Sequence, residues 1–431
     1  MTPAARLSAA IEVFDDIVTR RRPAADALKD WGLARRFAGS GDRAAIAGLV
    51  YDALRRRASA AWLMGGDSGR AVLLGTLRLD RRSDVRAIAA LCSGERFAPA
   101  PLSDGETERL GGDPGIPDAP SHVRADCPEW LAPSLERAFG SADMPAEMAA
   151  FARRAPLDLR VNVLKASREM VAAELGPLGA LPTPHSPWGL RIEHAPGERA
   201  PSIHADPTFL RGEIEIQDEG SQLACLLGAA EPAAQVVDLC AGAGGKTLAL
   251  AAMMGNGGQI YATDLDARRL APMHERLGRA GTRNIQVRTP RGKTDAVADL
   301  DGGADLVLVD APCTGSGTWR RNPDAKWRVR PGSLDVRVRD QATVLDRAAR
   351  LVRPGGRIAY ITCSVLPEEN DEAVEAFLRR GPGRTVLSPD DVLATSGLTG
   401  LRDRVRITRH GLQMSPLRTG TDGFYISLLR A

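Results

Sequence analysis

The sequence predicts an α/β protein in which a doubly wound core follows a small α+β module and an all-α N-terminal domain. Two patterns predict this order. From Gln235 onward, strand-like runs alternate with helices of about 10 to 20 residues, as in parallel sheets covered by helices on both faces. Residues 5–64 instead repeat their apolar side chains at helical spacing, which indicates a separate helical domain.

The length and composition are those of a soluble globular protein. At 431 residues, with 43% hydrophobic and 26% charged residues, the chain is expected to form two or three domains. No apolar run is long enough to span a membrane, and acidic residues interrupt the apolar pattern of the N-terminus, unlike in a secretion signal. We therefore expect a cytoplasmic protein, and we expect it to be a monomer.

The six cysteines are scattered along the chain without a C-x-x-C pair. This spacing provides neither a disulfide framework nor a zinc site, so no metal is expected. In a reducing compartment, a functional cysteine would act as a thiolate.

The helical N-terminal part is expected to end before a segment rich in proline and glycine. Within it, Asp42 stands where the N-cap of a helix belongs. Residues 97–120 contain five Pro and four Gly, which predicts a linker or a long loop. Three strand-like runs and one helical run follow within residues 157–217. The predicted divisions are an all-helical domain at 1–95, a linker at 96–130, an α+β module at 131–230 and the α/β core at 231–431.

Charge is distributed unevenly, although the net charge is only +3. Residues 1–100 carry 17 basic and 11 acidic groups, residues 101–230 carry 11 and 20, and residues 231–431 carry 29 and 23. Two basic regions therefore flank an acidic one. This pattern permits a polyanionic partner without requiring one.

The glycine-rich segment VVDLCAGAGGKT, residues 236–247, is the first motif that indicates a ligand site. A P-loop needs a glycine at position 240, where this chain has Cys240, and a dinucleotide-binding loop needs one at position 247, where it has Thr247. Both interpretations fail. The remaining interpretation is a strand that ends at Asp238, followed by a loop whose glycines let a ligand approach the start of a helix.

Asp264 ends the next strand, 20 residues after Gly244. A carboxylate in this place can hydrogen-bond both hydroxyls of a ribose. The pattern favours a cofactor of the adenosine type without a pyrophosphate site, and S-adenosylmethionine is the leading example. The alternative is that these residues are ordinary turn glycines and helix caps.

Two cysteines follow two later strands of the predicted sheet. Cys313 comes just after Asp310 in DAPCTGSGTWRRNPDAKW (310–327), and Cys363 ends the strand in RIAYITCSVLPEEND (357–371). Ligands in doubly wound sheets lie beyond the carboxyl ends of the strands. A single cysteine is more often a small buried filler, but two thiols at two strand ends indicate a site that uses both.

The segment Arg320–Arg339 carries seven basic and two acidic residues. Beside a ligand crevice, it predicts a track for phosphates, with Trp319 and Trp327 available to stack on unpaired bases. The alternative is a charged face exposed to solvent.

Taken together, the motifs closely resemble the Sun/Nop family of RNA cytosine-5 methyltransferases. The motifs that carry the resemblance occur in the family's order over residues 150–431: IQDEGSQL, DLCAGAGGKT, DAPCTGSGTWRRNPDAKW, TCSVLPEEND and MSPLRTGTDGFYISLLR. GDRAAIAGLVYDALRR near the N-terminus is similar to the NusB-like RNA-binding domain of the bacterial ribosomal-RNA members. One departure is Ala243, where the family usually has a proline.

The resemblance implies a Rossmann-like core that uses S-adenosylmethionine, and it implies a role for each site residue. Cys363 would attack carbon 6 of the cytosine, and Cys313 would help to release the product. Asp310 would bind the polar edge of the base. Lys246 would orient the base or stabilise the thiolate, although a solvated lysine at a helix end is an alternative. The residues expected at the cofactor are Asp238, Cys240, Ala241, Gly242, Gly244, Gly245, Lys246, Asp264, Asp310 and, as the acid near the adenine, Asp295.

The function that the resemblance implies is methylation of carbon 5 of a cytosine in ribosomal RNA, and the NusB-like domain favours the small-subunit (16S) RNA. The base must leave its stack to reach the two thiols, so we expect an unpaired or remodelled region of RNA as partner. The alternatives are a transfer-RNA cytosine-5 methyltransferase and an inactive RNA-binding factor for ribosome assembly. The presence of both thiols and of the cofactor residues argues against the inactive factor.

Overall fold

The computed structural model describes residues 1–193, 201–292 and 295–430, and these form two compact units. Unit 1 contains residues 1–154 together with the distant segment 319–330. Unit 2 contains residues 155–193, 201–318 and 331–430. Within the described residues, no helix combines the length and the apolar character that a membrane crossing requires.

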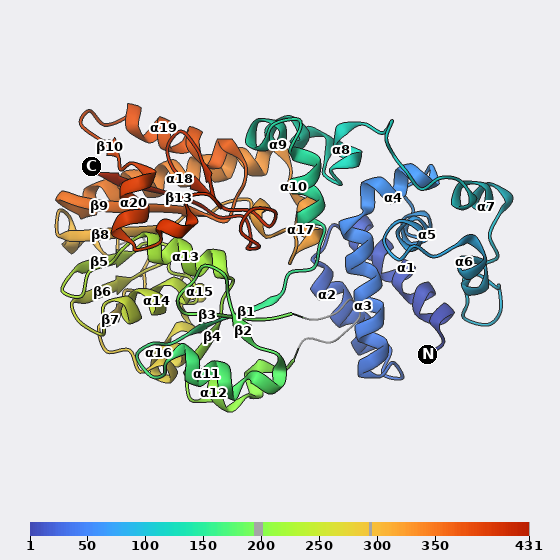
Figure 1. Ribbon diagram of the computed structural model, residues 1–431, viewed down its shortest axis with the longest axis horizontal. Helices are drawn as coiled ribbons and strands as arrows, with labels where there is room; N and C mark the ends of the chain where they lie inside the picture. Colours follow the sequence, from blue (N-terminus) through green and yellow to red (C-terminus); the bar gives the residue numbers. More distant parts are fainter. Residues whose placement is uncertain (194–200, 293–294, 431) are drawn as a thin grey trace. The chain divides into compact units, whose positions relative to one another are not determined.

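The regular elements in the described residues of unit 1 are all helices (Figure 1). Leu7, Phe14 and Ile46 are among the fully buried side chains of its core. Its helices are α1 (Pro3–Arg20), α2 (Ala24–Ala34), α3 (Ser40–Arg55), α4 (Arg57–Met64), α5 (Gly69–Leu79), α6 (Val85–Leu91), α7 (Asp104–Gly111), α8 (Ser121–Arg124), the 3₁₀ turn η1 (Glu129–Leu131), α9 (Ala132–Phe139), α10 (Met144–Phe151) and α17 (Pro323–Arg328).

Two local predictions for this unit are wrong. Asp42 is not the N-cap of α3. It lies in the first turn of the helix, where its carboxylate accepts a hydrogen bond from Arg6 Nε at 2.8 Å. The segment predicted as a linker at 96–130 contains α7 and α8. Helix α7 begins with a capping box in which Ser103 and Glu106 bond each other's backbone N–H groups.

The first part of unit 2 is a small antiparallel sheet with the strand order β2-β3-β1-β4. Leu159, Leu190 and Ile214 point into its core together with Val171 of α11. Helices α9 and α10, which the predicted module at 131–230 includes, lie in unit 1, and β1 is the first regular element of unit 2. Its elements are β1 (Leu157–Val161), α11 (Arg168–Glu174), η2 (Gly176–Leu178), β2 (Leu181–Pro182), β3 (Gly189–Ile192), η3 (Ile203–Ala205), α12 (Pro207–Leu210) and β4 (Ile214–Ile216).

The second part of unit 2 is built on a mixed sheet with the strand order β11-β12-β13-β9-β8-β5-β6-β7, and β10 pairs with β13. Figure 1 shows β9, β8, β5, β6 and β7 in this order from top to bottom. Its strands are β5 (Gln235–Asp238), β6 (Gln259–Ala262), β7 (Ile285–Val287), β8 (Ala304–Asp310), β9 (Val352–Thr362), β10 (Thr385–Val386), β11 (Arg406–Ile407), β12 (Leu412–Gln413) and β13 (Tyr425–Arg430).

The five strands from β5 to β9 are parallel, as the alternating pattern predicts. The C-terminal strand β13 differs, because it runs antiparallel to β9 and closes that side of the sheet. The helices and turns of this part are α13 (Glu219–Leu227), α14 (Gly245–Met253), α15 (Ala267–Leu270), α16 (Met273–Ala280), η4 (Ala298–Leu300), η5 (Ser316–Thr318), α18 (Pro331–Leu351), η6 (Pro367–Glu369), α19 (Asp371–Arg379), α20 (Pro389–Thr395) and η7 (Thr399–Leu401).

The order of the parallel strands reverses between β5 and β8. From β5 the chain continues to β6 and β7 on one side, and then returns to place β8 on the other side of β5. Such a reversal opens a crevice beyond the carboxyl ends of the two strands. Asp238 and Asp310 are the last residues of β5 and β8, so both lie at this crevice.

Candidate active site

The two cysteines at the strand ends lie next to each other. The sulfurs of Cys313 and Cys363 are 3.4 Å apart, and both side chains are half-buried. The loop after β8 is fastened to the end of β9, because the N–H of Gly317 donates to the carbonyl of Cys363 at 2.9 Å. This bond holds the two cysteines at a fixed separation without a covalent link.

The surroundings make the two thiols unequal. The hydrogen bond to Cys363 raises the pKa of the Cys313 thiol, and burial and the nearby charge of Glu369 raise this pKa further. These surroundings favour the neutral form of the Cys313 thiol. Either sulfur can be the donor of the contact between them, and a cysteine that attacks must do so from the thiolate form.

A buried ion pair lies at the same edge of the sheet. Lys246 Nζ in the first turn of α14 donates to Asp310 Oδ2 at 2.7 Å, and Lys246 is only 8% exposed. Burial acts to lower the pKa of Lys246, but the charges of Asp310 and Cys363 and the hydrogen bond outweigh it, so the pKa is raised. The alternative of a solvated lysine is therefore wrong. Lys246 is therefore held as a cation by Asp310, and the charge of the Cys363 sulfur is one of the causes that raise its pKa.

Glu369 is a site residue that sequence reasoning missed. It is fully buried, and its carboxylate accepts the N–H of Thr314 at 2.7 Å and the Thr314 hydroxyl at 2.6 Å. Burial raises its pKa, although these hydrogen bonds act in the opposite direction. Glu369 thus fixes the residue that follows Cys313. The run PEEND after Cys363 was the available signal, because acidic residues so close to a strand end need partners when they are buried.

The glycine loop adopts backbone conformations that suit glycine. Gly242 and Gly244 have φ of 52° and 86°, and Gly244 begins α14 as its N-cap. A Cβ on Gly244 would come within 2.9 Å of the Met273 side chain. The Asp264 carboxylate accepts the N–H of Gly242 at 3.0 Å and pairs with Arg269 at 3.0 Å. Asp264 therefore sits against the loop on which the cofactor was predicted.

Asp238 carries an unsatisfied acceptor at the start of this loop. It is fully buried, and Thr247 donates to its Oδ2 at 2.7 Å, but its Oδ1 has no hydrogen-bond partner within the described residues. Burial raises the pKa of Asp238 to about 7, and the charge of Asp310 adds to this rise, whereas the Thr247 bond lowers it. A buried oxygen without a partner is costly. A cationic or N–H-bearing ligand in this crevice would relieve that cost, so the residues fit the expected cofactor.

The other predicted cofactor residues are less informative. Ala241 donates its N–H to the carbonyl of Thr263 at 2.9 Å, and burial raises the pKa of the Cys240 thiol. Asp295 is engaged by Arg347, whose Nε donates to it at 3.0 Å. Burial acts to raise the pKa of Asp295, but the bonds from Val297 and Arg347 prevail, so the pKa is lowered.

The prediction of a phosphate track is wrong for its first part. Trp319, Arg320 and Lys326 are 1%, 4% and 4% exposed, within unit 1. Trp319 packs edge-on against Phe151, with the ring centroids 6.5 Å apart. Burial lowers the pKa of Lys326 to about 8, against the opposing charge of Asp126. Among these buried side chains, Lys326 Nζ donates to the carbonyl of Arg55 at 3.4 Å, whereas Trp319 Nε1 has no hydrogen-bond partner within the described residues. They anchor the segment and cannot stack on bases.

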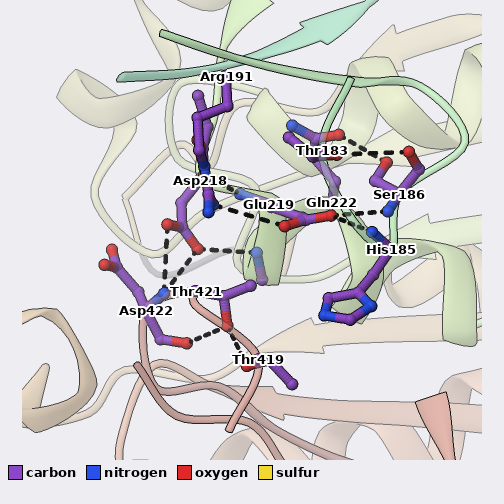
Figure 2. A network of polar contacts seen from close by, with 12 residues as sticks. Thr183, His185, Ser186, Arg191, Asp218, Glu219, Gln222, Thr419, Thr421 and Asp422 are labelled. Atoms are coloured by element: carbon purple, nitrogen blue, oxygen red, sulfur yellow. Dashed lines mark hydrogen bonds and ion pairs between the residues drawn. The ribbon is translucent and has the colours of Figure 1, made fainter. Parts of the chain in front are cut away.

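The IQDEGSQL motif is part of a polar network that connects the small module to the C-terminal loop (Figure 2). Glu219 accepts the N–H groups of His185 and Ser186 at 2.7 and 2.8 Å, and Asp218 accepts that of Asp422 at 3.1 Å. Phe424 follows two residues later, and Lys246 Nζ lies 5.2 Å from its ring centroid. The network thereby fixes a ring that contacts the catalytic candidate Lys246.

The sheet order, the glycine loop and the crevice define a Rossmann-like methyltransferase of the type that uses S-adenosylmethionine. A family model described as 16S rRNA methyltransferase RsmB/F matches residues 225–430, and a model of the ferredoxin-like domain of RsmF/B-like methyltransferases matches residues 127–197. The chain belongs to the RsmB/F (Sun/Nop) family, as the resemblance predicted, and S-adenosylmethionine is the cofactor of that family.

Relatives named ribosomal RNA small subunit methyltransferase B support this assignment. The Salmonella typhi protein is 32% identical, with 72% of this chain and 68% of the relative aligned. A probable methyltransferase B from Synechocystis is also 32% identical, over 70% of this chain and 66% of the relative. The chain thus spans slightly less than two thirds of the length of some relatives, and 61% for the one from Citrobacter koseri.

Two solved structures share the fold. The crystal structure of PH0851 matches with a TM-score of 0.72 and 24% identity, covering 100% of this chain and 99% of that one. A methyltransferase homologue from Pyrococcus horikoshii matches with a TM-score of 0.57 and 26% identity, covering 72% of this chain and 97% of its own.

Proposed function

We propose that the protein methylates carbon 5 of a cytosine in 16S ribosomal RNA through a thiol adduct at carbon 6. The observation that carries the proposal is the pair of sulfurs 3.4 Å apart at a strand-end crevice. The buried Lys246–Asp310 ion pair beside them supports it. The names of the relatives support the small-subunit RNA as substrate.

When it is bound, S-adenosylmethionine supplies an electrophilic methyl group. We infer that the glycine loop holds it, with Asp264 accepting hydrogen bonds from the ribose hydroxyls. Asp238 Oδ1 is the open acceptor in the same crevice. Asp295 stays a candidate for the adenine side.

Carbon 5 of cytosine is a poor nucleophile until a group adds to carbon 6. In the proposed first step, an electron pair of the Cys363 thiolate forms the bond to carbon 6, and the π electrons of the C5–C6 bond move to carbon 5. Asp310 has a side chain that is 34% exposed, so it is accessible to the polar edge of the base. Lys246 stabilises the negative charge of the thiolate before the attack and the charge that builds on the ring afterwards.

Product release requires the reverse movement of electrons. Cys313 first loses its own proton to solvent and then, as the thiolate, takes the proton from carbon 5, while the electrons of the C–H bond restore the C5–C6 double bond. The bond between carbon 6 and Cys363 then breaks, and its electrons return to the sulfur. The 3.4 Å contact between the sulfurs supports a mechanism in which both thiols act on one base, and the family resemblance supplies the division of roles.

Bisulfite sequencing of total RNA from a deletion strain tests the function. We expect a single cytosine of the 16S RNA to lose its modification and to regain it when the purified protein and S-adenosylmethionine are added. Loss in a transfer RNA instead would favour the transfer-RNA enzyme. An unchanged modification pattern would contradict the methyltransferase proposal and favour the inactive assembly factor.

A further inference from the structure

A basic pocket in unit 1 lies between α1, the start of α4, the turn before η1 and the anchored segment around α17. Its volume is about 300 Å³, and its basic and aromatic lining residues are Arg21, Arg57, Trp130, Trp327, Arg328 and Arg330. We call it the arginine–tryptophan pocket. Its volume is at the lower end of the range for pockets that bind small ligands.

Three of its arginines lack a direct counter-ion, although the charge of Asp67 acts on Arg57 without an ion pair or hydrogen bond between them. Within the part of the chain that the structure describes, Arg21, Arg57 and Arg330 form no ion pair and donate no side-chain hydrogen bond. Asp324 is the acidic residue of the lining, and its carboxylate is already paired with Arg328 at 3.0 Å. The pocket thus carries an excess of positive charge that an anion would balance.

The backbone at Arg21 is unusual. Arg21 ends α1 in the left-handed conformation, with φ of 51°, where helices commonly have glycine. An L-residue with a bulky side chain is disfavoured in this conformation. The chain therefore has an exposed arginine at the pocket, in a position where glycine would relieve the strain of the backbone.

The two tryptophans differ in what they contact. The Arg57 guanidinium lies 5.2 Å from the Trp327 ring centroid, and the Trp327 indole N–H donates to the carbonyl of Leu54 at 2.7 Å, so Trp327 holds Arg57 in place. Trp130 is half-buried at the pocket, and within the described residues it has no aromatic, cationic or hydrogen-bond partner. Trp130 is the ring that is available to a ligand.

We propose that the arginine–tryptophan pocket binds one unpaired nucleotide of the substrate RNA. Its phosphate lies among Arg21, Arg57 and Arg330, and its base stacks on Trp130. Guanidinium groups pair well with phosphate, and stacking on an aromatic ring tolerates any base. The inference rests on the proposed RNA substrate and adds an RNA-contacting pocket in the helical unit, built partly by a segment from the catalytic motif.

The test measures RNA affinity without cofactor. The probe is a fluorescein-labelled single-stranded RNA of mixed sequence and about 20 nucleotides, titrated with the full chain at several salt concentrations. Arg21→Gly and Arg330→Gln should each lower the slope of log affinity against log salt by about 0.7, the value for one lost phosphate contact on a single strand. Trp130→Ala should weaken binding about tenfold without changing this slope.

Arg21→Gly is the sharpest variant because it removes the charge and relaxes the backbone together. Its melting temperature should not fall, so a loss of RNA affinity would not be due to unfolding. Arg86→Gln is the matched control, since Arg86 is exposed on α6 of the same unit and does not line the pocket. Cytidine monophosphate that competes with RNA equally well for the wild type and the variants would place free-nucleotide binding elsewhere and contradict the pocket.

The outcomes separate this proposal from the proposed function. If folded pocket variants keep the affinity and salt slope of the wild type while the wild type methylates RNA, the pocket is wrong and the function stands. If the wild type methylates no RNA although the variants lose RNA affinity, the pocket binds RNA and the function is wrong.

Discussion

The two halves of the segment 310–327 end in different compact units, although they form one continuous motif. Residues 310–318 belong to unit 2 and bring Asp310 and Cys313 to the crevice. Residues 319–327 belong to unit 1, where Trp319 is 1% exposed. A continuous motif therefore serves two purposes, chemistry in the first half and anchoring in the second.

The residue types explain this difference. In the first half, small residues let the loop approach its neighbours, and a Cβ on Gly317 would lie 1.8 Å from the Gly423 carbonyl oxygen. The second half contains Trp319, Lys326 and Trp327. Burial of the apolar parts of these side chains among helices stabilises the folded state. The position of a residue within the motif did not indicate which compact unit that residue would join. The size of the side chains was the better indicator.

The largest expected effect comes from the thiols of the crevice. Cys363→Ala should abolish methylation and form no adduct, because the attacking sulfur is gone. In Cys313→Ala, Cys363 should still attack carbon 6 and carbon 5 of the base should still be methylated, but release should stall, so that a protein–RNA complex survives denaturing electrophoresis. Cys127→Ala, a buried thiol of unit 1, is the control and should keep its activity. A stable adduct in Cys363→Ala and none in Cys313→Ala would reverse the two roles.

The second effect concerns stability and tests the anchoring half of the motif. Trp319→Ala should lower the free energy of unfolding of unit 1 by about 3–5 kcal/mol, because a large buried ring leaves a cavity. Trp62→Ala is the matched control, since Trp62 is 48% exposed in the same unit, and its loss should be within about 1 kcal/mol. Denaturant unfolding followed by hydrogen exchange would localise the change. Equal losses for the two variants would contradict the anchoring role.

Much of the core could be predicted from sequence because strand ends are marked locally. The alternation of strands and helices located Asp238, Asp310 and Cys363, and parallel strands bring their carboxyl ends to one edge. The burial of Lys246 and of Glu369 could not be predicted, because it depends on which distant segments cover them. The sequence between two strands also gave no sign that residues 319–330 leave the core for another unit.

The third expected effect concerns cofactor binding in the crevice, where the first half of the motif ends. Asp264→Ala should weaken S-adenosylmethionine binding by about 1.5–3 kcal/mol, the range for hydrogen bonds to a charged group. Part of this loss would come from the Gly242 N–H, which Asp264 accepts at 3.0 Å. Asp264→Asn keeps one acceptor and should lose less. Calorimetry that shows unchanged affinity in folded Asp264→Ala would remove this residue from the cofactor site.

The smallest effect is a pH dependence that comes from Asp238. Burial raises the pKa of this carboxyl from 3.8 to about 7, so the folded chain without ligand favours its neutral form. The stability that this group contributes is present below pH 3.8 and is lost as the pH rises through about 7.

A cationic cofactor favours the ionised form of Asp238, so the affinity for the cofactor should rise by up to about tenfold from pH 6 to pH 7, and binding should release a proton. Calorimetry in buffers of different ionisation enthalpy measures that proton. Asp238→Asn keeps an acceptor for Thr247 and should remove the pH dependence. If the variant shows the same dependence as the wild type, another group is responsible, and the open oxygen of Asp238 is not where the cofactor's charge is recognised.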